Sequence, residues 1–373
     1  MLNNNLKITY FFQKGRNRKI ESGDIFAKEM YYGYFYIKSL YENVQIIEFH
    51  NHEKLWQKIL FKFERIIRTP LRLPIYWSYI TNYKNYRELK SSDLAIFTNN
   101  RVGSAALPML IMAKLFKSKV VSVCFIMGLF ARKPRFKFLE FFHNIYLKLF
   151  INKIDKIIFL SEGEYLHAKN IYPNKINKFF FIPFCIDNDI WKIKKFERTD
   201  DILFVGNDGF RDYDFLKNLI NNLPEINFNL VTTQINESEL KFKNYNLFRG
   251  SWGAPILTDE KLSDLYSKSL LTIIPLKESL QPSGQSVALQ SIACGTPVII
   301  TKTEGFWDKK KFKNYKNIFF VNSNNLDDWI FTINQIKKLS IYEIKELNIE
   351  MKKVITNYEL DRFNLALTKV LNI

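Results

Sequence analysis

Short apolar runs and longer amphipathic stretches alternate along the whole chain. The runs are rich in Ile, Val and Phe, as strands buried in a parallel sheet are, and the stretches between them have helical spacing. The expected strands, some with their exit loops, cover residues 6–12, 44–49, 91–100, 119–130, 154–160, 178–183, 201–208, 228–233, 246–250, 271–276, 298–301 and 318–322. Repeated strand–helix units predict an α/β protein.

The alternating strand–helix pattern occurs twice along the chain, and we predict that Lys192 to Asp200 is the linker between the two occurrences. We therefore expect two doubly wound, Rossmann-like domains that face each other across a cleft. The N-terminal domain is expected to cover residues 1–190 and the C-terminal domain residues 200–357. The chain has 373 residues, which is enough for two domains of ordinary size.

Three of the expected helices contain clusters of basic residues or follow one. The first runs from about Asp24 to Leu40 and follows a basic loop that contains Gly15. The second, in residues 54–76, alternates bulky apolar and basic residues, and a similar segment is helical from about Pro134. A helix of this kind either lies in a membrane interface or packs on a core with its basic face outward, and the pattern leaves both readings open. The apolar face of the second helix holds Trp56, Ile59, Leu60, Phe63, Ile66 and Ile67.

The stretch 271–307 concentrates the candidate chemistry. It predicts a strand, a polar loop, a helix from about Gly284 to Ala293 with Pro282 and Ser283 at its cap, and a second strand. The free N–H groups of the first turn and the helix dipole would then face the edge where parallel strands end, which suits a phosphate or diphosphate. Any strand–helix–strand unit has such a loop, so a structural role remains an equal alternative.

Residues 282–298, PSGQSVALQSIACGTPV, resemble the nucleotide-sugar motif of GT-B glycosyltransferases, especially glycosyltransferase family 4. A second resemblance lies in residues 154–187, where IDKIIFLSEGEYL precedes IPFCID. The chain departs from the family pattern at Pro282 and Gln290, where the family has Glu, and at Met127, where many members have His. The resemblance implies the GT-B fold and a last helix, from about 358 to 373, that packs back on the N-terminal domain.

By the same resemblance, the reaction is glycosyl transfer from a nucleotide-diphosphate sugar to a hydroxyl acceptor, retaining and metal-independent. No catalytic residue is assigned, and Arg211, Lys277 and Glu278 are the candidates. Arg211 and Lys277 would hold the diphosphate, and Gln290 the ribose. The expected donor-binding residues are Gly206, Asn207, Arg211, Trp252, Lys277, Ser283, Gly284, Gln285, Ser286 and Gln290. The expected acceptor-side residues are Gly15, Arg101 and Gly128.

The net charge of +18 is confined to the first half of the chain. Residues 1–195 contain 33 Lys and Arg against 15 Asp and Glu, whereas residues 196–373 contain 22 of each. An AT-rich genome inflates Lys but does not explain this asymmetry, which favours an anionic partner for the N-terminal half. We expect a saccharide or lipid-linked acceptor and peripheral association with an anionic membrane. The implied pathways are cell-surface polysaccharide, lipopolysaccharide or glycolipid biosynthesis.

Other classes of function fit less well. The chain shows no helix-turn-helix, zinc or single-strand-binding pattern, so we expect no nucleic-acid partner. His50 and His52 lack an obvious third ligand, and the three cysteines are far apart, so we expect no metal site, no separate cofactor and reduced, cytoplasmic thiols. No signal peptide or spanning segment is expected. The competing hypothesis is a GT-B scaffold that has lost its chemistry and acts as a binding protein.

Overall fold

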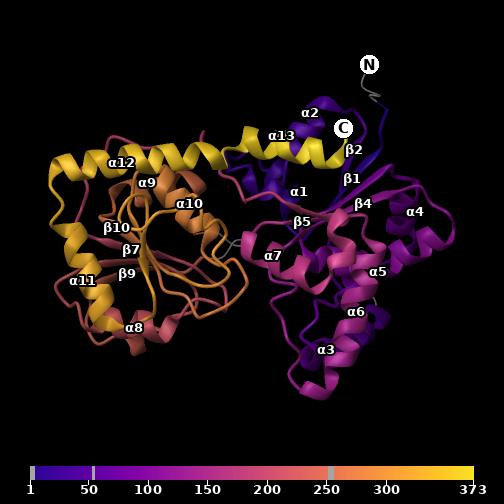
Figure 1. Ribbon diagram of the computed structural model, residues 1–373, viewed down its shortest axis with the longest axis horizontal. Coiled ribbons are helices and arrows are strands. Elements are labelled where there is room, and N and C mark those ends of the chain that lie inside the picture. The colour runs from indigo at the N-terminus through magenta and orange to yellow at the C-terminus, as the bar shows by residue number, and fades with distance from the viewer. Residues whose placement is uncertain (1–4, 53–54, 251–255) are drawn as a thin grey trace. The chain divides into compact units, whose positions relative to one another are not determined.

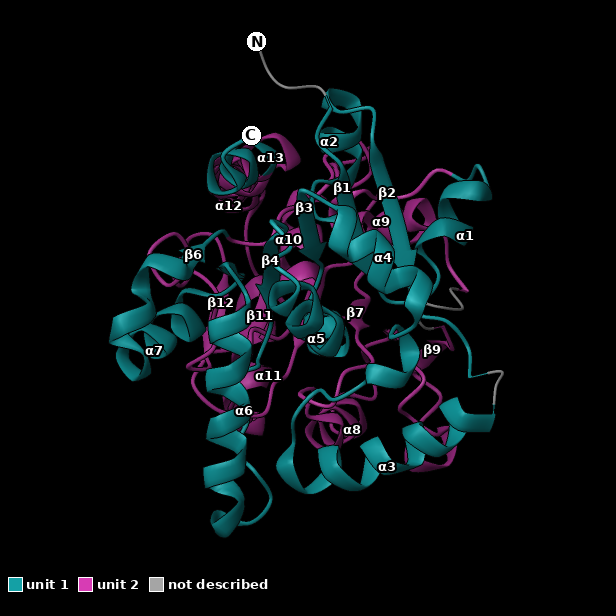
Figure 2. Ribbon diagram, turned by 90° about the vertical axis from the view of Figure 1, so that its right-hand side faces the viewer, with its two compact units in different colours: residues 1–24, 31–182, 364–373 teal, residues 25–30, 183–363 magenta. Residues whose placement is uncertain are grey.

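The computed structural model describes residues 5–52, 55–250 and 256–373. The chain divides into two compact units, coloured separately in Figure 2. Unit 1 comprises residues 1–24, 31–182 and 364–373, and unit 2 comprises residues 25–30 and 183–363. The segment 25–30 thus falls inside the predicted N-terminal domain but groups with unit 2. The limits of the two domains stay a prediction.

Unit 1 is built on a parallel six-stranded sheet in the order β2-β1-β3-β4-β5-β6 (Figure 1). Strands β1 and β3 are buried along their whole length because helices cover both faces, whereas the edge strand β2 is half-buried. The strands are β1 (Ile8–Phe12), β2 (Val44–Glu48), β3 (Leu94–Phe97), β4 (Val121–Ile126), β5 (Lys156–Phe159) and β6 (Phe179–Phe181).

The helices of unit 1 lie on both faces of this sheet. Phe11 of β1 belongs to the core under α5, while Tyr10 points to the opposite face, where its ring meets Tyr34 of α2. The helices are α1 (Arg16–Glu21), α2 (Tyr34–Leu40), α3 (Leu55–Leu71), α4 (Tyr83–Ser91), α5 (Asn100–Leu115), α6 (Glu140–Lys153), α7 (Glu162–Ile171) and α13 (Leu360–Leu371), whose residues from Asn364 onward belong to unit 1.

Two expected helices of unit 1 begin later than predicted. The first starts at Tyr34 and not at Asp24, because Gly33 adopts a left-handed conformation (φ 79°) at its N-cap. The preceding loop contains the short helix α1, which the sequence reading missed. The second basic segment becomes α-helical at Glu140 and not at Pro134, because Phe136 is extended and a single 3-10 turn, Lys137–Leu139, comes before the helix.

Unit 2 has a second parallel six-stranded sheet, in the order β12-β11-β10-β7-β8-β9. Helices α9, α10 and α12 lie on one face of it, and α8 and α11 on the other (Figure 1). The strands are β7 (Ile202–Val205), β8 (Phe228–Val231), β9 (Tyr245–Phe248), β10 (Leu271–Ile274), β11 (Val298–Thr301) and β12 (Phe319–Val321). The helices are α8 (Tyr213–Asn221), α9 (Asp259–Lys268), α10 (Gln285–Ala293), α11 (Leu326–Lys337) and α12 (Ile341–Ile355).

In both sheets, the first strand has early strands on one side and the later strands of the same sheet on its other side. The strand order reverses between β1 and β3 in unit 1, and between β7 and β10 in unit 2. Ligands of open α/β sheets bind beyond the carboxyl ends of the strands at such a reversal. The loops that follow β7 and β10 are therefore the first place to look for a ligand in unit 2. Across the described residues, no helix is both long and apolar enough to cross a membrane.

Candidate functional site

The candidate donor site of unit 2 is organised around the side chain of Arg211. Although charged, this residue is only 2 % exposed. Its Nη1 lies 3.1 Å from the carboxylate of Asp208, and within the described chain its Nε has no hydrogen-bond partner. A buried guanidinium with an unused donor is costly unless another group satisfies it, so the arrangement favours an anionic ligand.

Two glycines make room for this guanidinium. A Cβ atom at Gly206 would lie 2.6 Å from Arg211 Nε, and one at Gly284 would lie 3.5 Å from Arg211 Nη1 and 2.6 Å from a methyl group of Ile274. Gly284 also has φ 76°, a conformation that L side chains rarely adopt. The structure therefore brings Gly284 next to Gly206 and Arg211, two predicted donor-site residues that lie far from it in the sequence.

Gly284 is the N-cap of α10, which corrects the expected cap by Pro282 and Ser283. No side chain caps this helix, because the N-cap residue is a glycine. The first turn of α10 and the guanidinium of Arg211 together present positive charge at one point of the sheet edge. This is a geometry that suits the oxygens of a phosphate or diphosphate.

The loop after β10 is joined to the Arg211 loop by its backbone. Leu276 forms an isolated bridge with Arg211, and the N–H of Lys277 donates to the carbonyl of Phe210 at 2.8 Å. The side chain of Lys277 is exposed, and its charge lies near that of Asp214. The Glu278 carboxylate accepts hydrogen bonds from the N–H groups of Ser279 and Glu304, so it shapes this loop.

The remaining predicted donor residues have different surroundings. Ser283 and Gln285 are buried beside Gly284, and Ser286 is half-buried in the first turn of α10. The Asn207 side chain is held locally, since its amide donates to Gly250 and its carbonyl accepts from the N–H of Thr233. Trp252 lies outside the described residues.

Gln290 is bonded to a residue that the sequence reading missed. Its amide donates to the Glu29 carboxylate at 3.0 Å, and its oxygen accepts from the Tyr266 hydroxyl at 3.4 Å. Trp191 also donates to Glu29, at 2.7 Å. Burial raises the pKa of Glu29 to about 7, although these hydrogen bonds act in the opposite sense. No sequence signal could have paired Glu29 with Gln290, since 261 positions separate them.

The predicted acceptor-side residues follow three strands of unit 1. Gly15, with φ 104°, is the N-cap of α1 after β1. Arg101 lies in the first turn of α5 after β3, and its guanidinium sits 4.9 Å from the centre of the Tyr76 ring. Gly128, with φ 76°, follows β4. They share one edge of the sheet, because the strands are parallel.

Glu164 was predicted from the sequence only as the partner of the Ser161 helix cap, but its carboxylate holds the Gly128 turn. Its carboxylate accepts hydrogen bonds from the N–H groups of Gly128 (2.6 Å) and Phe130 (2.9 Å). Burial raises the pKa of Glu164 to about 7, while the two N–H donors and the charge of Arg132 lower it less strongly. Burial and the nearby charge of Arg101 lower the pKa of Arg132. Arg101 and Arg132 therefore form a basic pair beside the Glu164-held turn.

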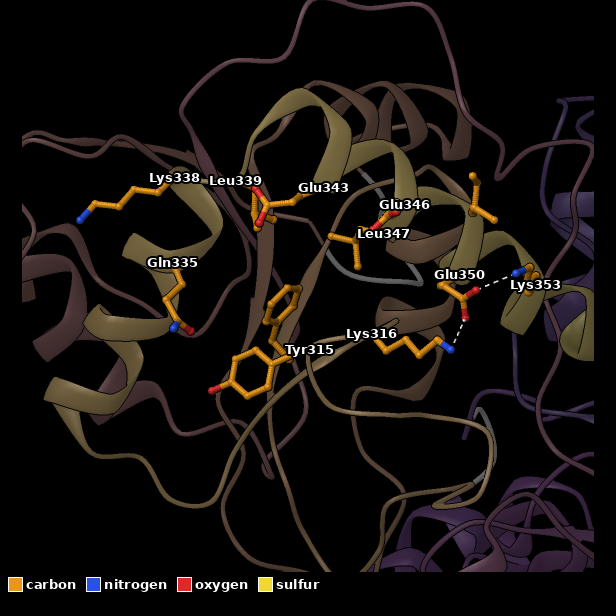
Figure 3. Close-up of a pocket in the computed structure, with 12 residues that line it drawn as sticks. Tyr315, Lys316, Gln335, Lys338, Leu339, Glu343, Glu346, Leu347, Glu350 and Lys353 are labelled. Atoms are coloured by element: carbon orange, nitrogen blue, oxygen red, sulfur yellow. Dashed lines mark hydrogen bonds and ion pairs between the residues drawn. The ribbon is translucent and has the colours of Figure 1, made fainter.

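Unit 2 also has a groove of about 820 Å³ (Figure 3). It is bordered by α11, α12 and the segment before β12. On its charged rim, Glu350 forms ion pairs with Lys316 at 3.2 Å and with Lys353 at 2.7 Å. None of the predicted donor residues lines it. The groove is therefore not part of the candidate site.

The two histidines of the H-x-H segment are engaged in hydrogen bonds. His52 bonds to the Ser78 hydroxyl, and His50 to the Gln57 amide. Within the ranges that the structure describes, no group of three His, Cys, Asp or Glu residues is placed to hold a metal ion.

Comparison with known proteins identifies the fold. No protein-family model matches the sequence, and no curated protein matches it. Among solved structures, Anabaena HepE in complex with UDP matches with a TM-score of 0.66 at 10% sequence identity. The match covers 98% of this chain and 100% of the HepE chain. Sucrose-phosphate synthase from Thermosynechococcus elongatus has a TM-score of 0.66 at 12% identity, with 98% of both chains covered. A glycosyltransferase from Rickettsia africae has a TM-score of 0.62 at 14% identity, with 98% of this chain and 99% of its own covered.

Proposed function

The chain has the GT-B fold, and we propose that it is a glycosyltransferase similar to family 4. It would transfer a sugar from a nucleotide-diphosphate sugar to a hydroxyl acceptor with retention and without a metal ion. The observation that carries this proposal is the buried Arg211 guanidinium against Gly206 and Gly284 at the start of α10. The similar structures of HepE are complexes with UDP and with UDP-glucose, which supports a nucleotide-sugar donor.

The chain's own residues would stabilise the leaving group. As the bond to the sugar breaks, negative charge grows on the diphosphate, and Arg211, Lys277 and the N–H groups at the start of α10 would stabilise it. The pair Gln290 and Glu29 would position the ribose. No side chain is assigned as a general base, and an oxygen of the departing phosphate would take the acceptor proton.

On the acceptor side, we propose that Arg101 and Arg132 attract an anionic acceptor to the edge of unit 1. The acceptor would be a saccharide or a lipid-linked sugar at the inner face of an anionic membrane, in the synthesis of a cell-surface polysaccharide, lipopolysaccharide or glycolipid. The charge of the N-terminal half supports this part of the proposal.

The donor assignment is tested by thermal-shift and calorimetric titration with a panel of nucleotide-diphosphate sugars. We expect one or a few of them to raise the melting temperature. Arg211→Ala should weaken their binding about tenfold to a hundredfold, because a charge-assisted hydrogen bond contributes about 1.5–3 kcal/mol. Arg362→Ala, which removes an exposed arginine of the same unit, is the matched control. A folded protein that binds no member of the panel would contradict the donor site.

A binding protein without chemistry is the second candidate, because Pro282 and Gln290 replace carboxylates and the Gln290 amide is engaged by Glu29. Measuring the release of nucleoside diphosphate from the bound sugar nucleotide distinguishes the enzyme from the binding protein. Release that disappears in Arg211→Ala supports the enzyme, and NMR of the product anomer then tests retention. Binding without release, in the presence of candidate acceptors, supports the binding protein.

A further inference from the structure

Helix α3 buries two polar side chains, Gln57 and Glu64, and exposes several of its large apolar ones. Glu64 is fully buried and Gln57 is 7 % exposed, whereas the exposed fraction rises to 74 % for Leu55 and 71 % for Ile66. The outward apolar stripe, spaced three or four residues apart, consists of Leu55, Trp56, Ile59, Phe63 and Ile66. Exposing so much apolar surface to water is unfavourable, so the stripe indicates an interaction site.

The inward side of α3 is held by specific hydrogen bonds, so its orientation is defined. The Glu64 carboxylate accepts from the N–H and the hydroxyl of Ser78, at 2.5 and 2.7 Å. Gln57 bonds to His50 at 2.9 Å. Turning the apolar stripe inward would leave these buried polar groups without partners, which is unfavourable.

A second apolar stripe lies on α6 and the residues just before it. His143, Leu147 and Phe150 form the buried side of this helix. The outward side, again with helical spacing, consists of Phe138, Phe141, Phe142, Ile145 and Leu149, with Phe138 the most exposed at 75 %. We call these residues and the outward residues of α3 the apolar face.

The two stripes belong to neighbouring helices of unit 1. The N–H of Arg135 donates to Pro70 at 2.7 Å, and the His143 ring bonds to the carbonyl of Leu71 at 2.8 Å. Both bonds join the C-terminal end of α3 to the start of the second segment. In Figures 1 and 2, α3 and the beginning of α6 lie at the same end of unit 1.

The charge around the apolar face selects an anionic partner. Residues 55–71 and 133–149 together contain eight Lys and Arg against two Glu, one of which is the buried Glu64. The exposed cations that flank the stripes are Lys58, Lys62, Arg65, Lys133, Arg135, Lys137 and Lys148. Aromatic and aliphatic side chains bordered by Lys and Arg are typical of helices that lie in the headgroup region of an anionic bilayer.

We propose that the apolar face of α3 and α6 docks unit 1 on an anionic membrane surface, with the apolar stripes among the acyl chains and the flanking cations at the phosphates. The protein would lie on the membrane and not span it. The proposal stands on the surface of unit 1 and rests on the proposed function only for the idea that the acceptor is held in that membrane.

The test uses the full chain and sedimentation with vesicles of phosphatidylcholine, with or without phosphatidylglycerol. We expect binding to the anionic vesicles, weaker binding at high salt, and little binding to the zwitterionic ones. Ile59→Glu with Ile66→Glu, and separately Phe138→Glu with Phe141→Glu, should each reduce partitioning at least tenfold. Phe331→Glu with Ile341→Glu is the matched control, because these side chains are 60 % and 72 % exposed on unit 2.

A second readout reports on α3 itself. Trp56 lies on the stripe and is 48 % exposed, so brominated lipids in anionic vesicles should quench its fluorescence, and Trp56→Phe should remove that part of the quenching. Failure of the parent protein to bind anionic vesicles overturns the proposal, as does undiminished binding by both stripe variants. If the parent forms a dimer that the stripe variants dissociate and binds no vesicles, a second copy covers the face and the proposal is wrong. The same variants are titrated with nucleotide-diphosphate sugars. This titration tests the proposed function independently of membrane binding.

Discussion

At the scale of single residues, the position of Arg211 depends on the absence of a side chain at Gly206. A Cβ atom at residue 206 would lie only 2.6 Å from Arg211 Nε, too close for the observed position of the guanidinium. Gly209, three positions later in the same loop, has nothing within 4 Å of its own Cβ position. The loop therefore provides its own matched pair of substitutions.

We predict that Gly206→Ala displaces the guanidinium and weakens binding of nucleotide-diphosphate sugars about tenfold or more, with the fold retained. Gly209→Ala should leave the affinity within about twofold. Isothermal titration calorimetry with the sugar nucleotide found in the panel measures both, and circular dichroism checks the fold. Equal affinities for the two variants would show that Arg211 does not need its observed position to bind the donor.

At the scale of elements, the best predicted ones are those whose pattern is local. The strands beginning at Ile8 and Val298 and the helix at Gln285 lie where the apolar runs and the A-C-G-x-P turn indicate. The late start of α2 was missed because a left-handed Gly33 looks in sequence like any other glycine. The reversed orientation of α3 was left open because the sequence shows an amphipathic helix but not which face the core accepts.

The partners of the candidate site were harder to predict than its elements. Arg211, Gly206 and Gly284 came from motifs that resemble a known family, and the structure brings them together. The contacts of Glu29 and of Glu164 could not be found in this way. Their roles arise from contacts between distant segments, with Gln290 in one case and the Gly128 turn in the other.

Packing between α13 and the start of α2 gives a prediction at the element scale. A Cβ atom at Gly33 would lie 2.6 Å from Leu367, which is fully buried, and Gly33 also has φ 79°. Gly23 has a similar φ of 70° but nothing within 4 Å. We expect Gly23→Ala to cost about 1 kcal/mol of stability from backbone strain alone, and Gly33→Ala to cost about 2–4 kcal/mol because the clash adds to it. Urea unfolding measures both, and equal losses would contradict the packing argument.

At the scale of the whole molecule, two fully buried carboxyl groups among the described residues have a pKa raised to about 7, Glu29 in unit 2 and Glu164 in unit 1. Their ordinary pKa is 4.5, so between pH 4.5 and 7 the folded protein holds protons that the unfolded chain has released. Stability therefore falls as the pH rises through this window, by up to about 3 kcal/mol for each group, and changes little above it.

We predict that Glu29→Gln, which resembles the protonated form, flattens this pH dependence in unit 2 alone. Glu164→Gln should reduce it in unit 1, where burial also raises the pKa of Glu64. Hydrogen exchange followed by mass spectrometry between pH 5 and 8, corrected for the intrinsic exchange rate, assigns the change to each unit. A pH dependence of protection that is unchanged in both variants would show that neither carboxyl group is protonated in the folded state.

The chain enters unit 2 twice, at residues 25–30 and from Pro183 onward, and returns to unit 1 at Asn364. Unit 1 is thus assembled from three separate pieces of the polypeptide, and its last piece is made only when synthesis of unit 2 is complete. On the ribosome, Gly33 would have no Leu367 to pack against until the final residues emerge. An expression fragment cut near residue 182 would remain in this unfinished condition. A circular permutant that begins near residue 364 would carry the unit 1 part of α13 at its start and supply Leu367 before Gly33 is made.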